Sequence, residues 1–413
     1  MRLTRRAVLG ACSALALVAA APVLGADAME AEVLHWWTSG GESAAVKVFA
    51  DRFTQVGGTW VDTAIAGGET ARAAGLNRIV GGNPPTVMQF NTGKQFDEIV
   101  ANDLLRPLDD VPGADKWREV LPPAIVEATT RDDHFYAVPV NIHGENWLFY
   151  NTKVLADAGL QPPQTFAELV AIGPKLKEQG IVPLAHGGQS WQDHTLFDAV
   201  LLAEAGPKTF VAVYGESDVD AVRSAEFRKA ADRFAELRGL IDPGSPGRNW
   251  NDATGMVITG KAAAQLMGDW AKGEFIAAGQ TAGKEYGCTV MPGGYVMGGD
   301  VFVFPKVDDP AQEAAQVKMA ELMMSPETQI EFNKKKGSVP VRLDVDVSSM
   351  DECAQKGMAT LRDPAQQIPS NSFLASPDLE GAIRDVVTAF WNTPSMTTDA
   401  FVEKFVGALE AAG

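Results

Sequence analysis

The stretch that decides the fold is VLHWWTSGGE, residues 33–42. Its apolar first half, residues 33–37, has the length and the residue types of a buried strand. The segment that follows repeats apolar residues at the spacing of one helix face: Ala45, Val48, Phe49 and Phe53. The local order is therefore strand, loop and helix, the unit from which α/β folds are built.

The loop between this strand and this helix carries side chains suited to ligand binding. In open α/β sheets, ligands bind beyond the carboxyl ends of the strands, where Trp36, Trp37 and Glu42 are expected to lie. The alternative is that both tryptophans belong to the hydrophobic core. Adjacent residues of an extended chain point to opposite sides, so both indoles cannot easily be buried on one face.

The beginning of the chain has the composition of an export signal. Arginines near the start are followed by an apolar run at residues 7–24 and by the small-residue cleavage pattern of residues 26–28. We therefore expect residues 1–28 to be a signal peptide and the mature protein to begin near Met29. No later apolar run approaches the roughly 18 residues of a membrane span, so a soluble protein outside the inner membrane is expected.

Charge and cysteine content narrow the functional classes. The whole chain has a formal net charge of −18, and loss of the signal's three arginines and one aspartate would make it −20. Such an acidic protein lacks the cations that neutralise phosphates, so nucleic acid is not an expected partner. Cys288 and Cys353 would be the two cysteines left in an oxidising compartment, where a disulfide between them is the default expectation.

The expected mature length, about 385 residues, exceeds what one hydrophobic core usually serves, so two lobes are expected. Strands predicted at 33–37, 59–64 and 86–90, each followed by a loop and a helix, favour a first lobe with a doubly wound, mostly parallel sheet. Further strands are predicted at 181–185 and 261–267. The indoles and polar groups that follow them indicate a second lobe that faces the first.

Side chains typical of binding sites gather after the predicted strands. They comprise four indoles, three carboxylates, one imidazole and one ammonium group: Trp36, Trp37, Trp191, Trp270, Glu42, Asp269, Asp300, His143 and Lys94. The C–H face of a pyranose ring stacks on an aromatic face, while its hydroxyls need fixed donors and acceptors. This mixture of residue types therefore favours a sugar-binding site.

The same carboxylates also admit a catalytic interpretation. Two of Glu42, Asp269 and Asp300 could hydrolyse a glycosidic bond, but that use depends on their separation, which the sequence does not give. The sequence contains no Gly-x-Ser-x-Gly or His-Glu-x-x-His motif, and its five histidines lack zinc-like spacing. A secreted glycoside hydrolase is therefore the alternative to a binding protein, and neither a metal nor a cofactor is expected.

Five separated motifs resemble one known family. They are HWWTSGGE at 35–42, VPVNIH at 138–143, LAHGGQ at 184–189 with WQD at 191–193, MGDW at 267–270, and KGSVPVR at 336–342. In this order they resemble the periplasmic glucose/mannose-type sugar-binding proteins of ABC importers, in extracellular solute-binding protein family 1. The resemblance covers essentially the whole expected mature chain.

The resemblance implies two doubly wound α/β lobes joined by a hinge of three crossings, as in maltose-binding proteins. It places the N-terminal lobe at 29–139 and 302–337, the C-terminal lobe at 150–294 and 344–413, and the hinge segments at 139–150, 294–301 and 337–344. It also implies a non-catalytic periplasmic protein that captures a monosaccharide in the interlobe cleft and delivers it to a membrane permease. We expect this protein to be a monomer.

The matching motif positions imply a set of sugar contacts: Trp36, Trp37, Glu42, Gln89, Lys94, Trp270, Asp300 and Lys336. His143, Trp191 and Asp269 complete the candidate ligand-binding site. One position departs from the family pattern, because relatives that bind glucose carry a histidine where this chain has Phe373. The resemblance therefore favours a neutral aldohexose without deciding which one.

Overall fold

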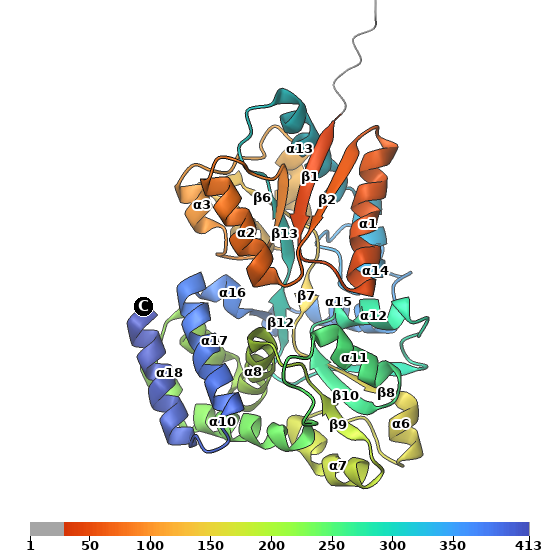
Figure 1. The fold of residues 1–413 in the computed structure, drawn as a ribbon, viewed down its shortest axis with the longest axis vertical. Coiled ribbons are helices and arrows are strands. Elements are labelled where there is room, and N and C mark those ends of the chain that lie inside the picture. Colours follow the sequence, from red (N-terminus) through yellow and green to blue (C-terminus); the bar gives the residue numbers. More distant parts are fainter. Residues whose placement is uncertain (1–28, 413) are drawn as a thin grey trace, which may run out of the picture.

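The computed structural model describes residues 29–412, so the expected signal peptide lies outside the described residues. Two α/β lobes are stacked along the long axis of the molecule, with a small central sheet between them (Figure 1). This two-lobed α/β architecture is the fold class that the sequence predicts.

The N-terminal lobe is built on a five-stranded sheet with the order β2-β1-β3-β13-β6. Its strands are β1 (Glu30–His35), β2 (Thr59–Ala64), β3 (Val87–Asn91), β13 (Asp300–Val303) and β6 (Ala137–Pro139). Its helices are α1 (Gly40–Gln55), α2 (Gly68–Val80), α3 (Asp97–Ala101), α4 (Trp117–Val120), α5 (Pro123–Thr129), α13 (Pro310–Met323) and α14 (Pro326–Lys336). A small hairpin of β4 (Thr130–Arg131) and β5 (His134–Phe135) lies beside them.

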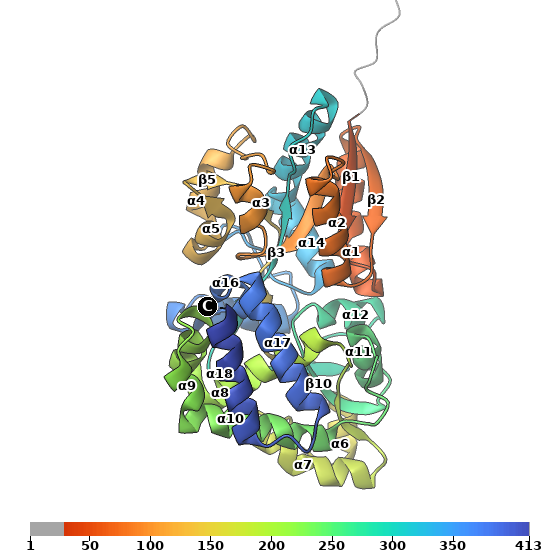
Figure 2. The same cartoon turned by 60° about the vertical axis from the view of Figure 1, so that its left-hand side comes forward.

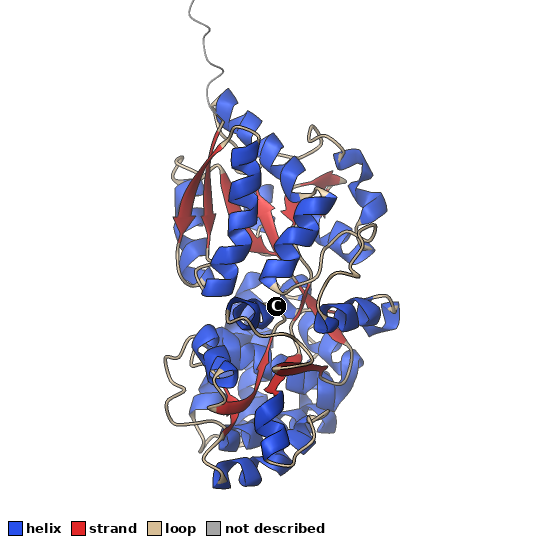
Figure 3. Cartoon of the chain, turned by 90° about the vertical axis from the view of Figure 1, so that its right-hand side faces the viewer, coloured by secondary structure: helices blue, strands red, loops and turns tan. Residues whose placement is uncertain are grey.

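Helices cover both faces of this sheet (Figure 3), and neighbouring residues of β1 belong to two different buried clusters. Val33 belongs to a buried cluster with Phe49 of α1, whereas Leu34 belongs to another with Ile79 of α2. A strand buried on both faces has a continuous apolar run in its sequence, as β1 has at Val33 and Leu34. β2, β1 and β3 are mutually parallel, and β13 runs antiparallel to both β3 and β6 because it enters the sheet from the hinge.

The C-terminal lobe contains a four-stranded sheet with the order β11-β8-β10-β9. Its strands are β8 (Trp147–Asn151), β9 (Val182–Ala185), β10 (Ala262–Met267) and β11 (Tyr286–Val290). Its longer helices are α6 (Thr152–Asp157), α7 (Phe166–Glu178), α8 (Ser190–Gly215), α9 (Val219–Arg223), α10 (Ala225–Leu237), α11 (Trp250–Ile258), α12 (Ala271–Ala277), α15 (Glu352–Leu361), α17 (Pro377–Asn392) and α18 (Thr398–Ala412). Figure 2 shows α8, α10, α17 and α18 packed together as one helical layer.

A three-stranded sheet with the order β14-β12-β7 joins the lobes. It consists of β7 (His143–Gly144), β12 (Tyr295–Gly298) and β14 (Gln367–Pro369). A third crossing lies beside β7, where the Ile142 and Val339 backbones exchange hydrogen bonds of 2.9 and 3.1 Å. β13 begins at Asp300, and β14 pairs in parallel with the hinge strand β12, so residues 367–369 belong to the sheet between the lobes.

Two local predictions have clear outcomes. The predicted Cys288–Cys353 disulfide is confirmed and links β11 to α15. The first strand was expected to include both tryptophans, and this is wrong, because β1 ends at His35. Ser39 then caps α1: its Oγ accepts the Glu42 backbone N–H at 3.4 Å, and Glu42 Oε2 accepts the Ser39 N–H at 3.3 Å. This reciprocal cap starts the helix and leaves the tryptophans in the loop.

Candidate functional site

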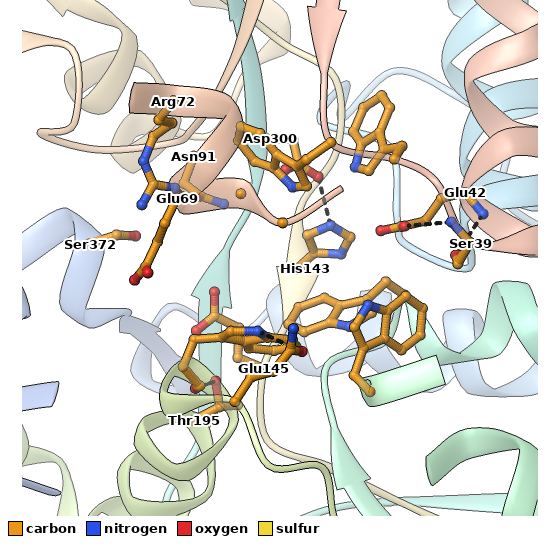
Figure 4. A pocket seen from close by; sticks show the side chains of 18 of the residues that line it. Ser39, Glu42, Glu69, Arg72, Asn91, His143, Glu145, Thr195, Asp300 and Ser372 are labelled. Atoms are coloured by element: carbon orange, nitrogen blue, oxygen red, sulfur yellow. Dashed lines mark hydrogen bonds and ion pairs between the residues drawn. The ribbon is translucent and has the colours of Figure 1, made fainter. Parts of the chain in front are cut away.

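A cavity of about 340 Å³ lies between the lobes. The N-terminal lobe lines it with the loop after β1 and the start of α2. The C-terminal lobe contributes the starts of α8 and α11, Trp270 just before α12, the short helix α16 (Asn371–Leu374) and α17, as Figure 4 shows in part. Pockets for small molecules usually occupy about 300–1,000 Å³, so the cavity has the size of a site for a small ligand.

Eight of the predicted ligand-binding residues line this cavity: Trp36, Trp37, Glu42, His143, Trp191, Trp270, Asp300 and Lys336. They come from the loop after β1, the starts of α1, α8 and α12, hinge strand β7, the start of β13 and the end of α14. Residues separated by up to 300 positions in the chain are therefore brought to one site.

The two adjacent tryptophans lie on opposite sides of the chain, as the extended geometry predicts. Trp36 is half-buried, whereas Trp37 is 1% exposed and packs against Phe302 of β13 and Phe332 of α14 with centroid distances of 5.6 and 5.3 Å. Trp37 is therefore mainly a core residue whose edge reaches the cavity. Trp36 and Trp270, both half-buried, provide accessible indole surface, as do the half-buried Trp191 and Trp250.

Lys336 is held among aromatic and acidic groups at one end of the cavity. Its Nζ is 3.4 Å from Glu42 Oε1 and lies 5.4 and 5.9 Å from the ring centroids of Trp37 and Trp270. An ammonium group at this distance from an indole is attracted to the ring face. Lys336 is 2% exposed, and Glu42 and the two indole rings balance its charge. Because it also lines the cavity, its ammonium group can donate a hydrogen bond to a ligand hydroxyl.

The position of Lys336 depends on the glycine that follows it. Gly337 has a φ of +88°, a left-handed conformation that ends α14. A Cβ at this position would come within 2.7 Å of the Asp269 carbonyl oxygen, so the turn fits directly against the C-terminal lobe. The left-handed conformation and the close contact with Asp269 both require a glycine at position 337. They also place Lys336 at the junction of the lobes.

Asp300, at the start of β13, is 3% exposed and has three donors around its carboxylate. Its Oδ1 accepts from Gln89 Nε2 at 2.9 Å, and its Oδ2 accepts from Asn141 Nδ2 at 2.8 Å and His143 Nε2 at 2.9 Å. Burial opposes ionisation, but the hydrogen bond and charge of His143 and the nearby Lys336 outweigh it and lower the pKa of Asp300. Asp300 is therefore a fixed carboxylate facing the cavity.

His143 lies on hinge strand β7 between a carboxylate from each lobe. Its Nδ1 donates to Asp269 Oδ1 at 2.5 Å and its Nε2 donates to Asp300 Oδ2 at 2.9 Å, as the dashed line in Figure 4 marks for Asp300. Burial disfavours the imidazolium, but the charges and hydrogen bonds of the two carboxylates raise its pKa. His143 is therefore a charged bridge across the hinge.

Three predicted site residues do not line the cavity. Gln89 is fully buried and supports the site from behind, donating to Asp300 and accepting the Trp36 backbone N–H at 3.1 Å. Asp269 is also buried, because it accepts hydrogen bonds from His143 and from the Gly144 N–H at 3.1 Å. Lys94 is exposed and donates to the Leu374 carbonyl at 2.7 Å, which joins the two lobes outside the cavity.

Several lining residues were not predicted from the sequence, notably Arg72, Glu145, Trp250, Asn371 and Ser372. Asn371 and Ser372 follow β14, and the neighbouring Phe373 does not line the cavity. The sequence pointed to this segment only through the departure expected at Phe373. No local pattern marks the others, because their helices and turns resemble ordinary surface elements.

Charged side chains of α2 and α17, one helix from each lobe, form another wall of the cavity. Glu69 of α2 pairs with Arg384 of α17, which also pairs with Glu380. Burial lowers the pKa of Arg72, and the charge of Glu380 opposes that shift. The ion pair between Glu69 and Arg384 therefore connects the two lobes beside the cavity.

Within residues 29–412, no group of three or more His, Cys, Asp or Glu side chains is arranged to hold a metal ion. None of the helices in the same range is both long enough and apolar enough to cross a membrane.

Residues 37–330 of the chain match a family model described as "Bacterial extracellular solute-binding protein". A "Probable sugar-binding periplasmic protein" of Brucella suis biovar 1 is 37% identical over 422 aligned positions, covering 100% of this chain and 99% of that relative. A similar protein of Rhizobium meliloti, with the same description, is 37% identical and covers 97% of this chain and 98% of its own length.

Among solved structures, the maltose-maltodextrin-binding protein of Alicyclobacillus acidocaldarius has a TM-score of 0.67 at 17% identity. The alignment covers 92% of this chain and 100% of that one. At such low identity the likeness concerns the fold alone, and it agrees with the two-lobed architecture described above.

Proposed function

The chain belongs to the bacterial extracellular solute-binding proteins, and from this premise we propose that it is the sugar-binding subunit of an ABC importer. It is a periplasmic protein, as its relatives are described to be. The single observation that supports a sugar ligand is the interlobe cavity, which combines accessible indoles with buried, fixed hydrogen-bonding groups.

The two kinds of lining residue suit the two chemical faces of a sugar. Trp36 and Trp270 present aromatic surface to the C–H face of a pyranose ring. Asp300 and Lys336 are held in place by other protein groups, so they can bind hydroxyls without being reorganised. Fixed partners also reject analogues that lack a hydroxyl, since an unpaired buried group costs about 1–3 kcal/mol.

Within sugars, the ligand that we propose is a neutral monosaccharide of the glucose or mannose type. Charged lining groups are already paired with one another, as for Glu42 with Lys336 and Asp300 with His143. A neutral polyhydroxylated ring complements such a surface without adding an unbalanced charge. The loaded protein would then deliver its sugar to membrane permease subunits.

The hydrolase alternative rests on Glu42, Asp269 and Asp300, and each of these carboxylates is engaged by protein groups, Asp300 by Gln89, Asn141 and His143. Asp269 is directed to His143 and Gly144 and does not line the cavity. Glu42 caps α1 and pairs with Lys336. We therefore propose a non-catalytic role.

A ligand panel tests this function. Thermal unfolding should be measured with D-glucose, D-mannose, D-galactose, D-xylose and maltose, together with an aryl glycoside turnover assay. We expect a saturable rise in unfolding temperature with at least one aldohexose, because a ligand that binds the folded state stabilises it, and no turnover. Absence of a shift with every sugar, or hydrolysis of the aryl glycoside, would contradict the proposal.

A further inference from the structure

Glu145 is a carboxyl group at the hinge that the assigned sugar contacts leave without a role. It lies between hinge strand β7 and β8, where its backbone N–H donates to the Val296 carbonyl at 2.9 Å. Its side chain lines the cavity on the side opposite Asp300, beneath His143 in Figure 4. Within the described chain, neither a backbone group nor a side chain makes a hydrogen bond to this carboxyl.

The hinge has room for this side chain because of a glycine on the neighbouring strand. A Cβ added to Gly298 of β12 would lie 1.7 Å from Glu145 Oε1 and 2.7 Å from its Cδ. Both atoms belong to the carboxyl group itself, so any larger residue at position 298 would displace it. The carboxyl therefore occupies a defined place against the central sheet, between the two lobes.

Several ionisable groups surround Glu145, from every element that packs near it. They are His143 of β7, Asp269 after β10, Asp300 of β13, Glu380 of α17 and Asp198 of α8. Burial raises the pKa of Glu145 to about 8; the charge of His143 opposes this shift and the neighbouring carboxylates add to it. At neutral pH the group is therefore mostly a neutral acid, which can donate one hydrogen bond and accept others.

A polar group that finds no partner in the protein has to find one in the solvent or in the ligand. A ligand that displaces water from the Glu145 carboxyl without replacing the hydrogen bonds of that water loses affinity. A sugar hydroxyl both donates and accepts, so it can satisfy a carboxyl group. Burial at this position disfavours a ligand carboxylate, and the charges of Glu380 and Asp300 add to that effect, while the charge of His143 opposes it.

Resting on the proposed sugar-binding function, we propose that Glu145 is a specificity-determining residue that hydrogen-bonds a sugar hydroxyl at the hinge side of the cavity. The site accordingly takes neutral sugars and rejects those that carry an anionic group at this position. This assigns to the hinge a part in selecting the ligand, in addition to its part in joining the lobes.

The test compares the wild type with Glu145→Gln and Glu145→Ala by titration calorimetry at pH 6.5. The probes are the tightest-binding sugar among D-glucose, D-mannose and D-galactose, and the corresponding uronic acid. Glu145→Ala should lower affinity for the neutral sugar about 5- to 100-fold, the range for a lost hydrogen bond to a buried group. Glu145→Gln should stay within about threefold of wild type, because an amide also donates and accepts. The uronic acid should bind the wild type at least about tenfold more weakly than the neutral sugar.

A pH series separates this role from a merely structural one. As pH rises through about 8, Glu145 ionises, loses its donor proton, and the affinity of the wild type for the neutral sugar should fall. Glu145→Gln cannot ionise, so its affinity should stay nearly constant from pH 6.5 to 9. An equal fall in both proteins would overturn the assignment.

Controls keep the result unambiguous. Glu178→Ala, at the exposed end of α7, removes a carboxylate far from the cavity and should bind like the wild type. Thermal unfolding without sugar shows whether each variant is folded, and Glu145→Gln serves if Glu145→Ala is not. If the wild type binds no sugar, the proposed function fails. If the wild type binds and Glu145→Ala binds equally well, or if Glu145→Gln loses as much affinity as Glu145→Ala, only the role of Glu145 fails.

Discussion

Asp300 shows how a single residue connects the hinge to the ligand space. Its carboxylate accepts hydrogen bonds from β3, from the first crossing and from β7, through Gln89, Asn141 and His143. These donors keep it ionised although it is buried. A carboxylate oxygen can accept more than one hydrogen bond, so Oδ1, with one protein donor, retains capacity for a ligand hydroxyl.

Substitution of Asp300 should therefore weaken ligand binding. Asp300→Ala removes a charge-assisted acceptor, and we expect a loss of roughly 1.5–3 kcal/mol in binding free energy, measured by calorimetry with the best sugar of the panel. The unfolding temperature should also fall, because His143 loses one of its two carboxylate partners. Asp308→Ala, in the exposed loop after β13, is the matched control. Unchanged sugar affinity in Asp300→Ala would remove this residue from the site.

Among the secondary-structure elements, β11 and α15 are joined covalently. Cys288 and Cys353 are 65 positions apart and their Cα atoms lie 6.1 Å apart. Cys353 is fully buried, so α15 is pinned to the edge of the C-terminal sheet. The segment that returns from the third crossing is thereby held close to the hinge strand β12, against which α15 also packs.

Removal of the disulfide should lower stability. For the paired substitution Cys288→Ser with Cys353→Ser, we expect the free energy of unfolding in urea to fall by about 2–4 kcal/mol, since the open chain gains entropy when unfolded. Sugar affinity should change little, because neither cysteine lines the cavity. Two free thiols titrated in the unfolded, unreduced wild-type protein would contradict the bond itself.

Over the whole molecule, the two lobes meet on both sides of the cavity. On one side α1 approaches α12 so closely that a Cβ at Gly41 would lie 2.4 Å from the Gly273 carbonyl carbon, and the Gly41 N–H donates to Glu274 Oε1 at 2.7 Å. On the other side Glu69 pairs with Arg384. A ligand enclosed between these contacts touches both lobes and favours the arrangement in which they are closed.

Sugar binding should therefore compact the protein. We expect the radius of gyration from small-angle X-ray scattering to fall on addition of saturating sugar, at constant mass, because contacts shared by both lobes exist only in the closed state. The Asp300→Ala variant, at the same sugar concentration, should show a smaller population of the compact form. Identical scattering with and without sugar, under conditions where calorimetry shows binding, would mean a cleft that is closed beforehand or a site on one lobe.

The sequence by itself determined those features that depend on local periodicity. Apolar runs and helical spacing predicted strands at 59–64 and 181–185, observed at 59–64 and 182–185, and the helix carrying Phe49 and Phe53, because strand and helix repeats are short-range properties. The sole pair of cysteines within the described residues determined the disulfide. Motifs after the strands also indicated eight of the residues that line the cavity, since parallel strands bring their carboxyl ends to one edge.

Only the tertiary structure decided which polar side chains reach the ligand space. Gln89 and Asp269 have the same chemistry as true lining residues, yet each is turned toward another protein group. Glu145, which lacks a distinctive motif, lines the cavity because Gly298 on a strand about 150 residues away leaves it room. Such outcomes depend on how two lobes pack across the hinge, and no local sequence pattern encodes that packing.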